Sequence, residues 1–378
     1  MRFLAITNHG LSELLVREFN QKFGIKATAE SESKVLFETE MEELIEVFRR
    51  SQGIYRICAL ISKVVIDEKS EEAKRQVREW IKSCNLSRYM DGKQKFAVRA
   101  HRFGDHQFRS VDIAAWGGEA IINWFTEEKK IRPKVDLTHP ETLFRIYVIE
   151  ETYWLTLDLT GTFAIERNYR RFDHPAGLRS QLAFLAVLLS EWNSNEGLLF
   201  DPTTGSGTIP IEAILFNQRK PISDHHWNDL LLHNWKEWKP VELIVQANKK
   251  ETMKLAIGQD RSSKFIKYAE THAQLAGVST NIDFRQVDFL RSPHIPKDVT
   301  HIVFNPPFGV RMGKKEQLER LYTTIFQSAK EYGIKTVTQF MTKRNLIREI
   351  ADDQGYSIAE EYRFSYGGIT VFLVKFQS

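Results

Sequence analysis

Two short motifs hold the residues that could do chemistry in this chain. The first, DPTTGSGT, runs from Asp201 to Thr208, and its glycines allow the backbone to approach a ligand closely. The second, NPPFG, begins at Asn305. Its consecutive prolines fix the backbone and remove two N–H donors, so carbonyl groups are free to face a cleft. The carbonyls of Asn305 and Pro306 could therefore accept both hydrogens of a planar exocyclic amine, with the ring of Phe308 stacked on a base.

Such an arrangement would align the nitrogen of the amine with an electrophilic methyl group, so that positioning and electrostatics carry the catalysis. Both motifs directly follow short apolar runs, GLLF and HIVF, which predict buried strands. Asp260 and Asp288 follow two further predicted strands. Because an open α/β sheet binds ligands at the carboxyl ends of its strands, these residues should meet in one cleft. Ionised, Asp260 could accept from ribose hydroxyls and Asp288 from an adenine amine.

Two other enzyme classes are disfavoured. A dinucleotide fingerprint would need a third glycine where Pro210 stands, and an acid about 20 residues further on, whereas Asp260 lies 59 residues after Asp201. Methylation at carbon 5 of a pyrimidine generally needs a cysteine nucleophile. The chain has two cysteines, Cys58 and Cys84, and neither lies in the half that carries the motifs. The sequence therefore favours nitrogen as the methyl acceptor.

The pattern of elements predicts two kinds of architecture. Up to residue 165, short strands and helices alternate and close on a hairpin, which is typical of α+β regions with antiparallel pairing. From Leu178 onward, strand and helix alternate regularly and end in two adjacent strands. This indicates an α/β domain with a doubly wound parallel sheet and an antiparallel edge strand. At 42% apolar and 27% charged residues, with no signal peptide or membrane span, we expect a soluble, cytoplasmic, globular protein without a membrane partner.

The motifs resemble those of a known family. DPTTGSGTIPIEA together with NPPFG is similar to class I S-adenosylmethionine-dependent methyltransferases that act on exocyclic amines of nucleobases. FAVRAHRFGDHQFRS, WLTLDLTG and ERNYRRFDHPAGLRSQLA extend the resemblance to THUMP-containing RNA guanine-N2 methyltransferases, which include tRNA and 23S rRNA enzymes. The resemblance implies a ferredoxin-like segment over residues 1–62, an RNA-gripping THUMP domain over 63–165, a basic linker over 166–180 and a Rossmann-like catalytic domain over 181–378. Many relatives have Phe-Cys where this chain has Thr203-Thr204.

The same resemblance implies roles for individual residues. Asp201, Gly205 and Gly207 would border the methionine moiety of the cofactor, Asp260 its ribose and Asp288 its adenine. The full implied cofactor-binding set is Asp201, Thr203, Gly205, Ser206, Gly207, Thr208, Asp260, Arg261, Asp288, Phe289 and Asn305. The implied catalytic set, around the target base, is Asn305, Pro306, Pro307 and Phe308.

Charge alone does not announce an RNA partner. The net charge is +4, and residues 1–165 hold 25 basic and 25 acidic side chains. Local basic runs stand out instead, and each is either an RNA contact or a solvated face. We expect phosphate contacts, weakened by salt, from two sets of arginines. They are Arg99, Arg102 and Arg109 in the THUMP-like segment, and Arg167, Arg170, Arg171 and Arg179 in the linker.

Together these observations predict an S-adenosylmethionine-dependent RNA methyltransferase that forms N2-methylguanosine, with tRNA the preferred substrate and 23S rRNA the second. The alternatives are an RNA-binding protein with a degenerate methyltransferase domain, and methylation of adenine or of a protein amine. The insertion at residues 217–250 carries His225, His226 and His233 without carboxylate or cysteine partners at ligand spacing, so no metal is expected there. That insertion is expected to be a packed flap over the cofactor or the RNA.

Overall fold

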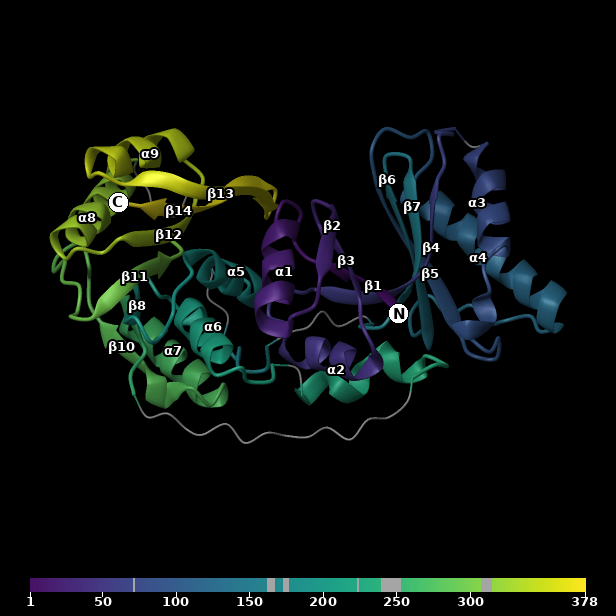
Figure 1. Ribbon diagram of the computed structural model, residues 1–378, viewed down its shortest axis with the longest axis horizontal. Helices are drawn as coiled ribbons and strands as arrows, with labels where there is room; N and C mark the ends of the chain where they lie inside the picture. Colours follow the sequence, from purple (N-terminus) through teal and green to yellow (C-terminus); the bar gives the residue numbers. More distant parts are fainter. Residues whose placement is uncertain (71, 162–166, 173–176, 223, 239–252, 307–314) are drawn as a thin grey trace.

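The computed structural model describes residues 1–378 except 71, 162–166, 173–176, 223, 239–252 and 307–314. The described residues form two seven-stranded sheets in an elongated molecule (Figure 1). The first sheet occupies the centre and right of that view, and the second lies on the left. Both termini belong to sheet strands or directly flank them.

The first sheet has the strand order β2-β3-β1-β4-β7-β6-β5. Its strands are β1 (Arg2–Ile6), β2 (Ala27–Ser31), β3 (Lys34–Glu38), β4 (Arg56–Val65), β5 (Phe96–Phe103), β6 (Thr142–Ile149) and β7 (Thr152–Asp158). Neighbours are antiparallel except β5 and β6, which are parallel. Strand β4 pairs with β1 on one side and β7 on the other, so one continuous sheet joins the ferredoxin-like and THUMP-like regions. The expected boundary after residue 62 falls inside β4 and stays a prediction.

Helices cover one face of this sheet. They are α1 (Ser12–Glu18), continued by the π-helix η1 (Phe19–Phe23), α2 (Met41–Arg50), α3 (Ala73–Lys82) and α4 (Ser110–Lys129), with a short 3-10 turn η2 (Leu86–Arg88) after α3. Alternation along the strands sends Phe3 and Ala5 of β1 into the core beneath the helices. Leu4, between them, joins Tyr147 and Trp154 in a small cluster on the opposite face. That second face carries none of the helices described above.

The second sheet has the strand order β10-β9-β8-β11-β12-β14-β13. Its strands are β8 (Leu198–Asp201), β9 (Ala256–Asp260), β10 (Ile282–Gln286), β11 (Val299–Phe304), β12 (Thr336–Met341), β13 (Ser357–Tyr366) and β14 (Ile369–Gln377). The five strands β10, β9, β8, β11 and β12 are parallel to one another, while β14 is antiparallel to both β12 and β13. The predicted doubly wound sheet with an antiparallel edge is therefore confirmed. The chain order reverses between β8 and β11, which makes their carboxyl ends the switch point where such sheets bind ligands.

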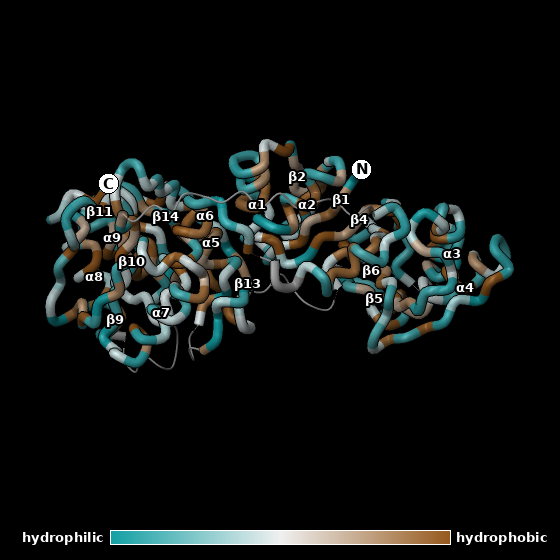
Figure 2. The backbone as a smooth tube through the Cα atoms, turned by 90° about the horizontal axis from the view of Figure 1, so that it is seen from below, coloured by the Kyte–Doolittle hydropathy of each residue, from teal (hydrophilic) through white to brown (hydrophobic). Residues whose placement is uncertain are grey.

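Helices lie on both faces of this second sheet. On one face are α5 (Ser180–Ser190), α6 (Thr208–Asn217) and α7 (Ser263–Leu275), with the short turn η5 (Ser279–Asn281); on the other are α8 (Lys315–Glu331) and α9 (Arg344–Asp353). Helix α5 is apolar around its whole circumference, and all its residues are buried because it packs between the sheet and α1. The brown stretches along α5 and α6 in Figure 2 mark this apolar centre. A single core thus runs from the first region into the second.

The insertion after α6 packs against the N-terminal region. Its described part, with 3-10 turns η3 (Asp224–Asp229) and η4 (Leu231–Asn234), leads to Trp235. The Trp235 ring meets Phe3 of β1 edge-on at 6.2 Å and stacks on Tyr89 at 6.5 Å, while Trp227 meets Phe48 of α2 at 6.5 Å. The aromatic rings of this described part therefore pack on the first region, and the expected flap over the cofactor or the RNA stays a prediction.

The described residues contain neither a membrane-spanning helix nor a metal-binding cluster. Within the ranges given above, the helices are too short or too polar to cross a bilayer. The same ranges hold no group of three or more His, Cys, Asp and Glu side chains arranged to bind a metal ion. His233 instead donates a hydrogen bond from its Nε2 to the carbonyl of Trp227, at 2.7 Å.

Candidate active site

A cavity of about 350 Å³ opens at the carboxyl ends of β8, β9 and β11. It therefore straddles the switch point of the parallel sheet. All the residues expected to bind a cofactor line this cavity except Gly207. Those that line it are Asp201, Thr203, Gly205, Ser206, Thr208, Asp260, Arg261, Asp288, Phe289 and Asn305. The residues predicted after four separate strands thus line a single cavity.

The glycine-rich loop is shaped by two left-handed residues. Gly205 has φ of 53° and Gly207 has φ of 82°, a region that side chains with a Cβ rarely adopt. A Cβ on Gly207 would lie 2.8 Å from the Ala269 side chain and 2.8 Å from the Phe284 ring. The absence of a Cβ at Gly207 therefore lets the loop pack against α7 and β10, and the role expected for Gly207 at the cofactor stays a prediction. Gly205, by contrast, lines the cavity, and its N–H donates to Asp260 Oδ2 at 3.1 Å.

Three carboxyl groups border the cavity, and they differ in environment. Asp260 also accepts from the N–H of Ser262 at 2.8 Å, and Asp288 accepts from the N–H of Leu290 at 3.2 Å. Asp201 is almost fully buried and accepts from the N–H of Thr203 at 3.0 Å. Burial raises the pKa of Asp201 to about 8, and the nearby Asp260 adds to the rise. At neutral pH, and without a bound cation, Asp201 therefore holds a proton.

Asn305, directly after β11, presents a buried hydrogen-bond acceptor to which no described residue donates. Its side-chain Oδ1 is buried and has no partner among the described residues, although the residue lines the cavity. The Asn305 main-chain carbonyl accepts from the Thr203 hydroxyl at 3.5 Å. Because buried polar atoms are nearly always paired, the free Oδ1 points to a donor supplied by a ligand. Pro306 is buried beside it, while Pro307 and Phe308 lie outside the described residues.

Residues that sequence reasoning missed also line the cavity. Gly177 and Leu178 come from the linker, which the sequence assigned to RNA contact, and Phe265 comes from α7. Their residue types carry no chemical signal, since glycine and apolar side chains occur throughout the chain. Only the fold shows that these parts of the linker and of α7 line the cavity.

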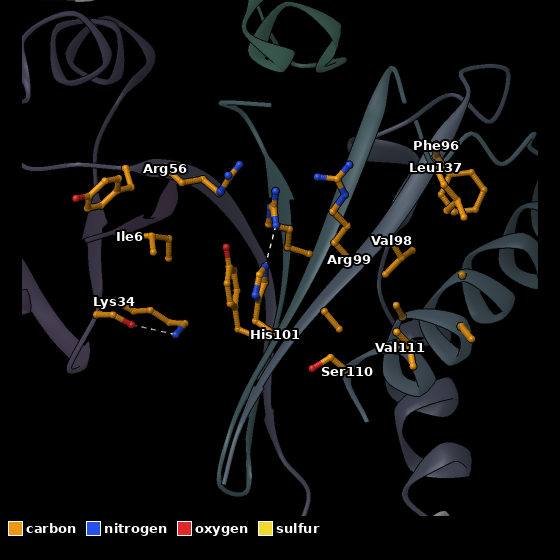
Figure 3. Close-up of a pocket in the computed structure, with 18 of the residues that line it drawn as sticks. Ile6, Lys34, Arg56, Phe96, Val98, Arg99, His101, Ser110, Val111 and Leu137 are labelled. Carbon is orange, nitrogen blue, oxygen red and sulfur yellow. Dashed lines mark hydrogen bonds between the residues drawn. The ribbon is translucent and has the colours of Figure 1, made fainter. Parts of the chain in front are cut away.

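A second and larger cavity, of about 1080 Å³, lies on the first sheet. Figure 3 shows that it reaches both sides of the edge strand β5, with Arg99 and His101 on one side and Phe96 and Val98 on the other. This follows from the alternation of side chains along a strand. We call it the groove. Its apolar side also includes Val111 of α4 and the exposed Leu137.

The groove is positively charged. Five lysine and arginine side chains line it and one carboxylate, Glu119, does so; the cations are Lys34, Arg56, Arg99, Arg145 and Arg179. Behind them, the buried Asp158 pairs with Arg56 and with Arg145, each at 2.6 Å, so one carboxylate serves two guanidinium groups. An excess of positive charge in a concave, partly apolar surface attracts anions that carry flat rings.

Burial tunes two further groups in the groove. Lys34 has its Nζ 4.8 Å from the centre of the Tyr147 ring, and burial lowers the pKa of Lys34 to about 8. His101 stacks on Tyr147 with ring centres 5.5 Å apart. Burial, reinforced by the Arg145 charge, lowers the pKa of His101, so its ring is held neutral. Of these groove residues, the sequence had indicated only Arg99 and Arg179 as RNA contacts.

The other expected RNA contacts have different surroundings. Arg102 donates to the carbonyl of Gly104 at 2.5 Å, and the exposed Arg109 pairs with Asp112 at 3.3 Å at the start of α4. Arg170 donates to the carbonyl of Leu178 at 2.9 Å, while Arg171 is exposed. The structure gives these four side chains no place in the lining of the groove.

Arg167 contradicts the expectation outright. Its side chain is 1% exposed, and its Nε lies 2.9 Å from Oε1 of the fully buried Glu212. A guanidinium enclosed in this way cannot reach a phosphate. The prediction of RNA contact is wrong for this residue because the linker turns into the protein there.

The end of the linker contributes residues to the lining of both cavities. Gly177 and Leu178 line the first cavity, and the next residue, Arg179, lines the groove. The Arg179 guanidinium lies between two aromatic rings, 5.9 Å from that of Tyr55 and 5.8 Å from that of Tyr366. Consecutive linker residues therefore line first one cavity and then the other.

In a comparison with known proteins, two family profiles match different parts of the chain. Residues 73–158 match the THUMP domain profile, and residues 167–371 match the profile described as RMKL-like, methyltransferase domain. Proteins named tRNA (guanine(6)-N2)-methyltransferase from Methanocaldococcus jannaschii and Archaeoglobus fulgidus are each 28% identical. The first alignment covers 98% of both chains, and the second covers 100% of this chain and 92% of the other.

More distant similarities extend the picture. A protein from Syntrophotalea carbinolica named ribosomal RNA large subunit methyltransferase K/L is 26% identical, over 86% of this chain and 47% of its own. Among solved structures, the methyltransferase SMU.472 complexed with SAH has a TM-score of 0.81 and 18% identity, over 100% of this chain and 98% of that one. This likeness shows the shared fold. The chain carries a THUMP domain and belongs to the family of RMKL-like methyltransferase domains.

Proposed function

We propose that this methyltransferase transfers the methyl group of S-adenosylmethionine to the exocyclic N2 amine of a guanosine in tRNA. The observation that carries the proposal is the buried, unpartnered Oδ1 of Asn305 at the edge of the switch-point cavity. An amine hydrogen is the kind of donor this atom lacks.

The lining of the cavity fits the cofactor. Its volume of about 350 Å³ is in the range of small-ligand sites. The glycine-rich loop offers backbone at close approach, and Asp260 and Asp288 offer carboxylate acceptors from neighbouring strand ends. The methyl donor would be held by the residues predicted from the sequence, all of which line the cavity except Gly207. When bound, S-adenosylmethionine supplies a methyl group on a positively charged sulfur.

The chain's own contribution to the reaction is orientation. Asn305 Oδ1 accepts one hydrogen of the target amine, which fixes the plane of the base and turns the nitrogen toward the cavity. As that nitrogen gains positive charge during transfer, its N–H becomes more acidic and the same hydrogen bond strengthens. Such a bond stabilises the transition state more than the ground state. The sequence assigns the second amine hydrogen to the carbonyl of Pro306.

The choice of tRNA rests on the relatives and on the groove. The two relatives with tRNA names match over at least 92% of their own length, whereas the rRNA relative matches over 47% of its own. The groove, with five cations and an apolar side, supports an RNA partner, as the THUMP profile does. In this proposal residues 1–165 hold the RNA, residues 166–180 connect, and residues 181–378 catalyse. An RNA substrate of this kind is consistent with a cytoplasmic enzyme.

The test uses the purified full chain, unmodified tRNA and rRNA, and S-adenosylmethionine with a labelled methyl group. Mass spectrometry of the digested RNA should find N2-methylguanosine in tRNA. We expect Asn305→Ala to lower the rate at least 100-fold, while Asn195→Ala, at an exposed asparagine outside the cavity, leaves it unchanged. Thermal unfolding should be the same for the three proteins. Equal rates for all three would refute the proposal, and N6-methyladenosine or labelled protein would replace it with another amine substrate.

A further inference from the structure

A buried polar cluster lies between the N-terminal region and the helix that follows the glycine-rich loop. We call Glu18, Lys22, Gln52, Arg167 and Glu212 the clamp. The four charged side chains of the clamp are each at most 1% exposed, and Gln52 is fully buried. They come from three separate parts of the chain: the first 53 residues, the linker and α6. The proposed reaction uses none of these groups.

Glu212 is the centre of the clamp. Its carboxylate accepts from Arg167 Nε at 2.9 Å, from Gln52 Nε2 at 2.7 Å and from the Tyr169 hydroxyl at 2.9 Å. Arg167 also donates to the main-chain carbonyl of Gln52 at 2.9 Å. One carboxylate of α6 is thereby bonded to the linker and to the N-terminal region at once.

The N-terminal half of the clamp holds Gln52 in turn. Gln52 Oε1 accepts from Lys22 Nζ at 2.8 Å, and its N–H donates to Glu18 Oε1 at 2.7 Å. Glu18 Oε2 accepts from the Ser51 hydroxyl at 2.8 Å and from the N–H of Gly53 at 3.0 Å. The turn at residues 51–53 is therefore fixed on both sides, directly before Tyr55 and Arg56, which line the groove.

Stability alone is a weak reason for these charges. Two acids and two bases removed from water lose hydration, and well-packed apolar side chains often replace such buried pairs without loss of stability. The surroundings are apolar: Lys22 Nζ lies 5.4 Å from the ring centres of both Phe184 and Phe216. Unlike apolar contacts, these ion pairs and hydrogen bonds are directional. They therefore permit a single geometry between the three segments.

The clamp connects segments of the chain that line the two cavities. Glu212 lies in α6, whose first residues Thr208 and Ile209 line the cofactor cavity. Downstream of Arg167, the linker is also fixed: the N–H groups of Arg171 and Phe172 donate to His272 Nε2 at 3.2 and 3.1 Å. The other ring nitrogen of His272 lies 3.1 Å from the carbonyl of Ser206 in the glycine-rich loop.

We propose that the clamp residues are positioning residues: they hold the groove at one distance and angle from the cofactor cavity, and so select which nucleotide of a bound RNA reaches Asn305. The proposal rests on the proposed function for its RNA. Its mechanical part, the fixed relation of groove and cavity, does not depend on activity.

The first experiment measures that mechanical part. Spin labels at Lys129→Cys on α4 and Gln317→Cys on α8, in a Cys84→Ser background, report the distance between the two regions; Cys58 is fully buried and stays. We expect Arg167→Met with Glu212→Gln, which removes both charges and keeps an acceptor, to widen the distance distribution at least twofold. Arg75→Met with Glu79→Gln, at an exposed ion pair on α3, should leave it unchanged. A clamp variant that is folded and has an unchanged distribution overturns the proposal.

The second experiment reads selection directly. On full-length tRNA, the clamp variant should raise the fraction of methyl groups at other guanosines at least tenfold, while its affinity for S-adenosylmethionine stays within threefold of the wild type. An unaltered methylation pattern with a widened distribution overturns the claim about selection. Should the double variant fail to fold, Gln52→Leu, which keeps both ion pairs, is measured in the same way. If the wild type methylates no RNA, the proposed function fails while the distance measurement still decides the mechanical part.

Discussion

The cofactor cavity and the groove are built on different principles. The cavity collects polar residues from the carboxyl ends of several parallel strands and from the loops that follow them. The groove collects cations from β3, β4, β5 and β6, and Arg179 from the end of the linker. The cavity residues come together because the parallel strands that precede them end at the same edge of the sheet. The groove residues come together only because the strands that carry them pair side by side. The residues of the cavity can therefore be recognised in the sequence by their position after predicted strands, whereas those of the groove cannot.

The largest effect should come from filling the space above the glycine-rich loop. Gly207→Ala places a Cβ 2.8 Å from Ala269 and Phe284 and keeps a positive φ. We expect a loss of about 2 to 4 kcal/mol in the free energy of unfolding, from strain and overpacking, with loss of S-adenosylmethionine binding. Urea unfolding and calorimetry measure both. Gly367→Ala is the control, because it has positive φ but open space around it, and should cost about 1 kcal/mol.

This contrast explains how much could be predicted from the sequence. Asp201, Asp260, Asp288 and Asn305 were identifiable because each is a polar residue directly after an apolar run, and parallel strands end at the same edge. Gly207 shows a limit of such prediction, because a sequence does not distinguish a glycine needed for ligand approach from one needed for packing. That distinction depends on Phe284, 77 residues away, and appears only on folding.

The groove was less accessible to prediction. Lys34, Arg56 and Arg145 lie in three strands far apart in the chain, and strand register brings them together. Arg167 shows the opposite error. A run of arginines in a linker is a plausible RNA contact, but the buried Glu212 that pairs with one of them gives no sign of it in an apolar helix sequence.

A loss of about tenfold is expected from the groove. Arg99→Met removes one phosphate-seeking cation, and the affinity for tRNA should fall by that factor, with a salt dependence reduced by about one ion. Binding of S-adenosylmethionine, in the other cavity, should be unchanged. Filter binding at several salt concentrations measures the first quantity. Arg75→Met on α3, outside the groove, should behave as the wild type; an equal loss in both variants would mean that RNA is bound by charge in general.

A pH-dependent effect is expected at Asp201. Its pKa of about 8 in the folded protein lies above its usual value of about 4, so the folded protein binds one proton more than the unfolded chain between those pH values. The stability of the ligand-free protein should therefore fall as the pH rises through this window. A cationic ligand favours the ionised form, so affinity for S-adenosylmethionine should rise with pH up to about 8 and then level off. Calorimetry at several pH values checks this, and Asp201→Asn should remove the dependence.

The smallest effect separates an exposed arginine from one in the groove. Arg109 is among the residues predicted to bind RNA, yet its guanidinium pairs with Asp112, and the Asp112 carboxylate accepts the Arg109 N–H at 2.8 Å to cap α4. Arg109→Ala should therefore change tRNA affinity by less than about threefold, since an exposed, already paired charge gives little to a phosphate. It should cost about 0.5 kcal/mol of stability through the weakened start of α4. A tenfold loss, equal to that of Arg99→Met, would extend the RNA surface beyond the groove and over the first turn of α4.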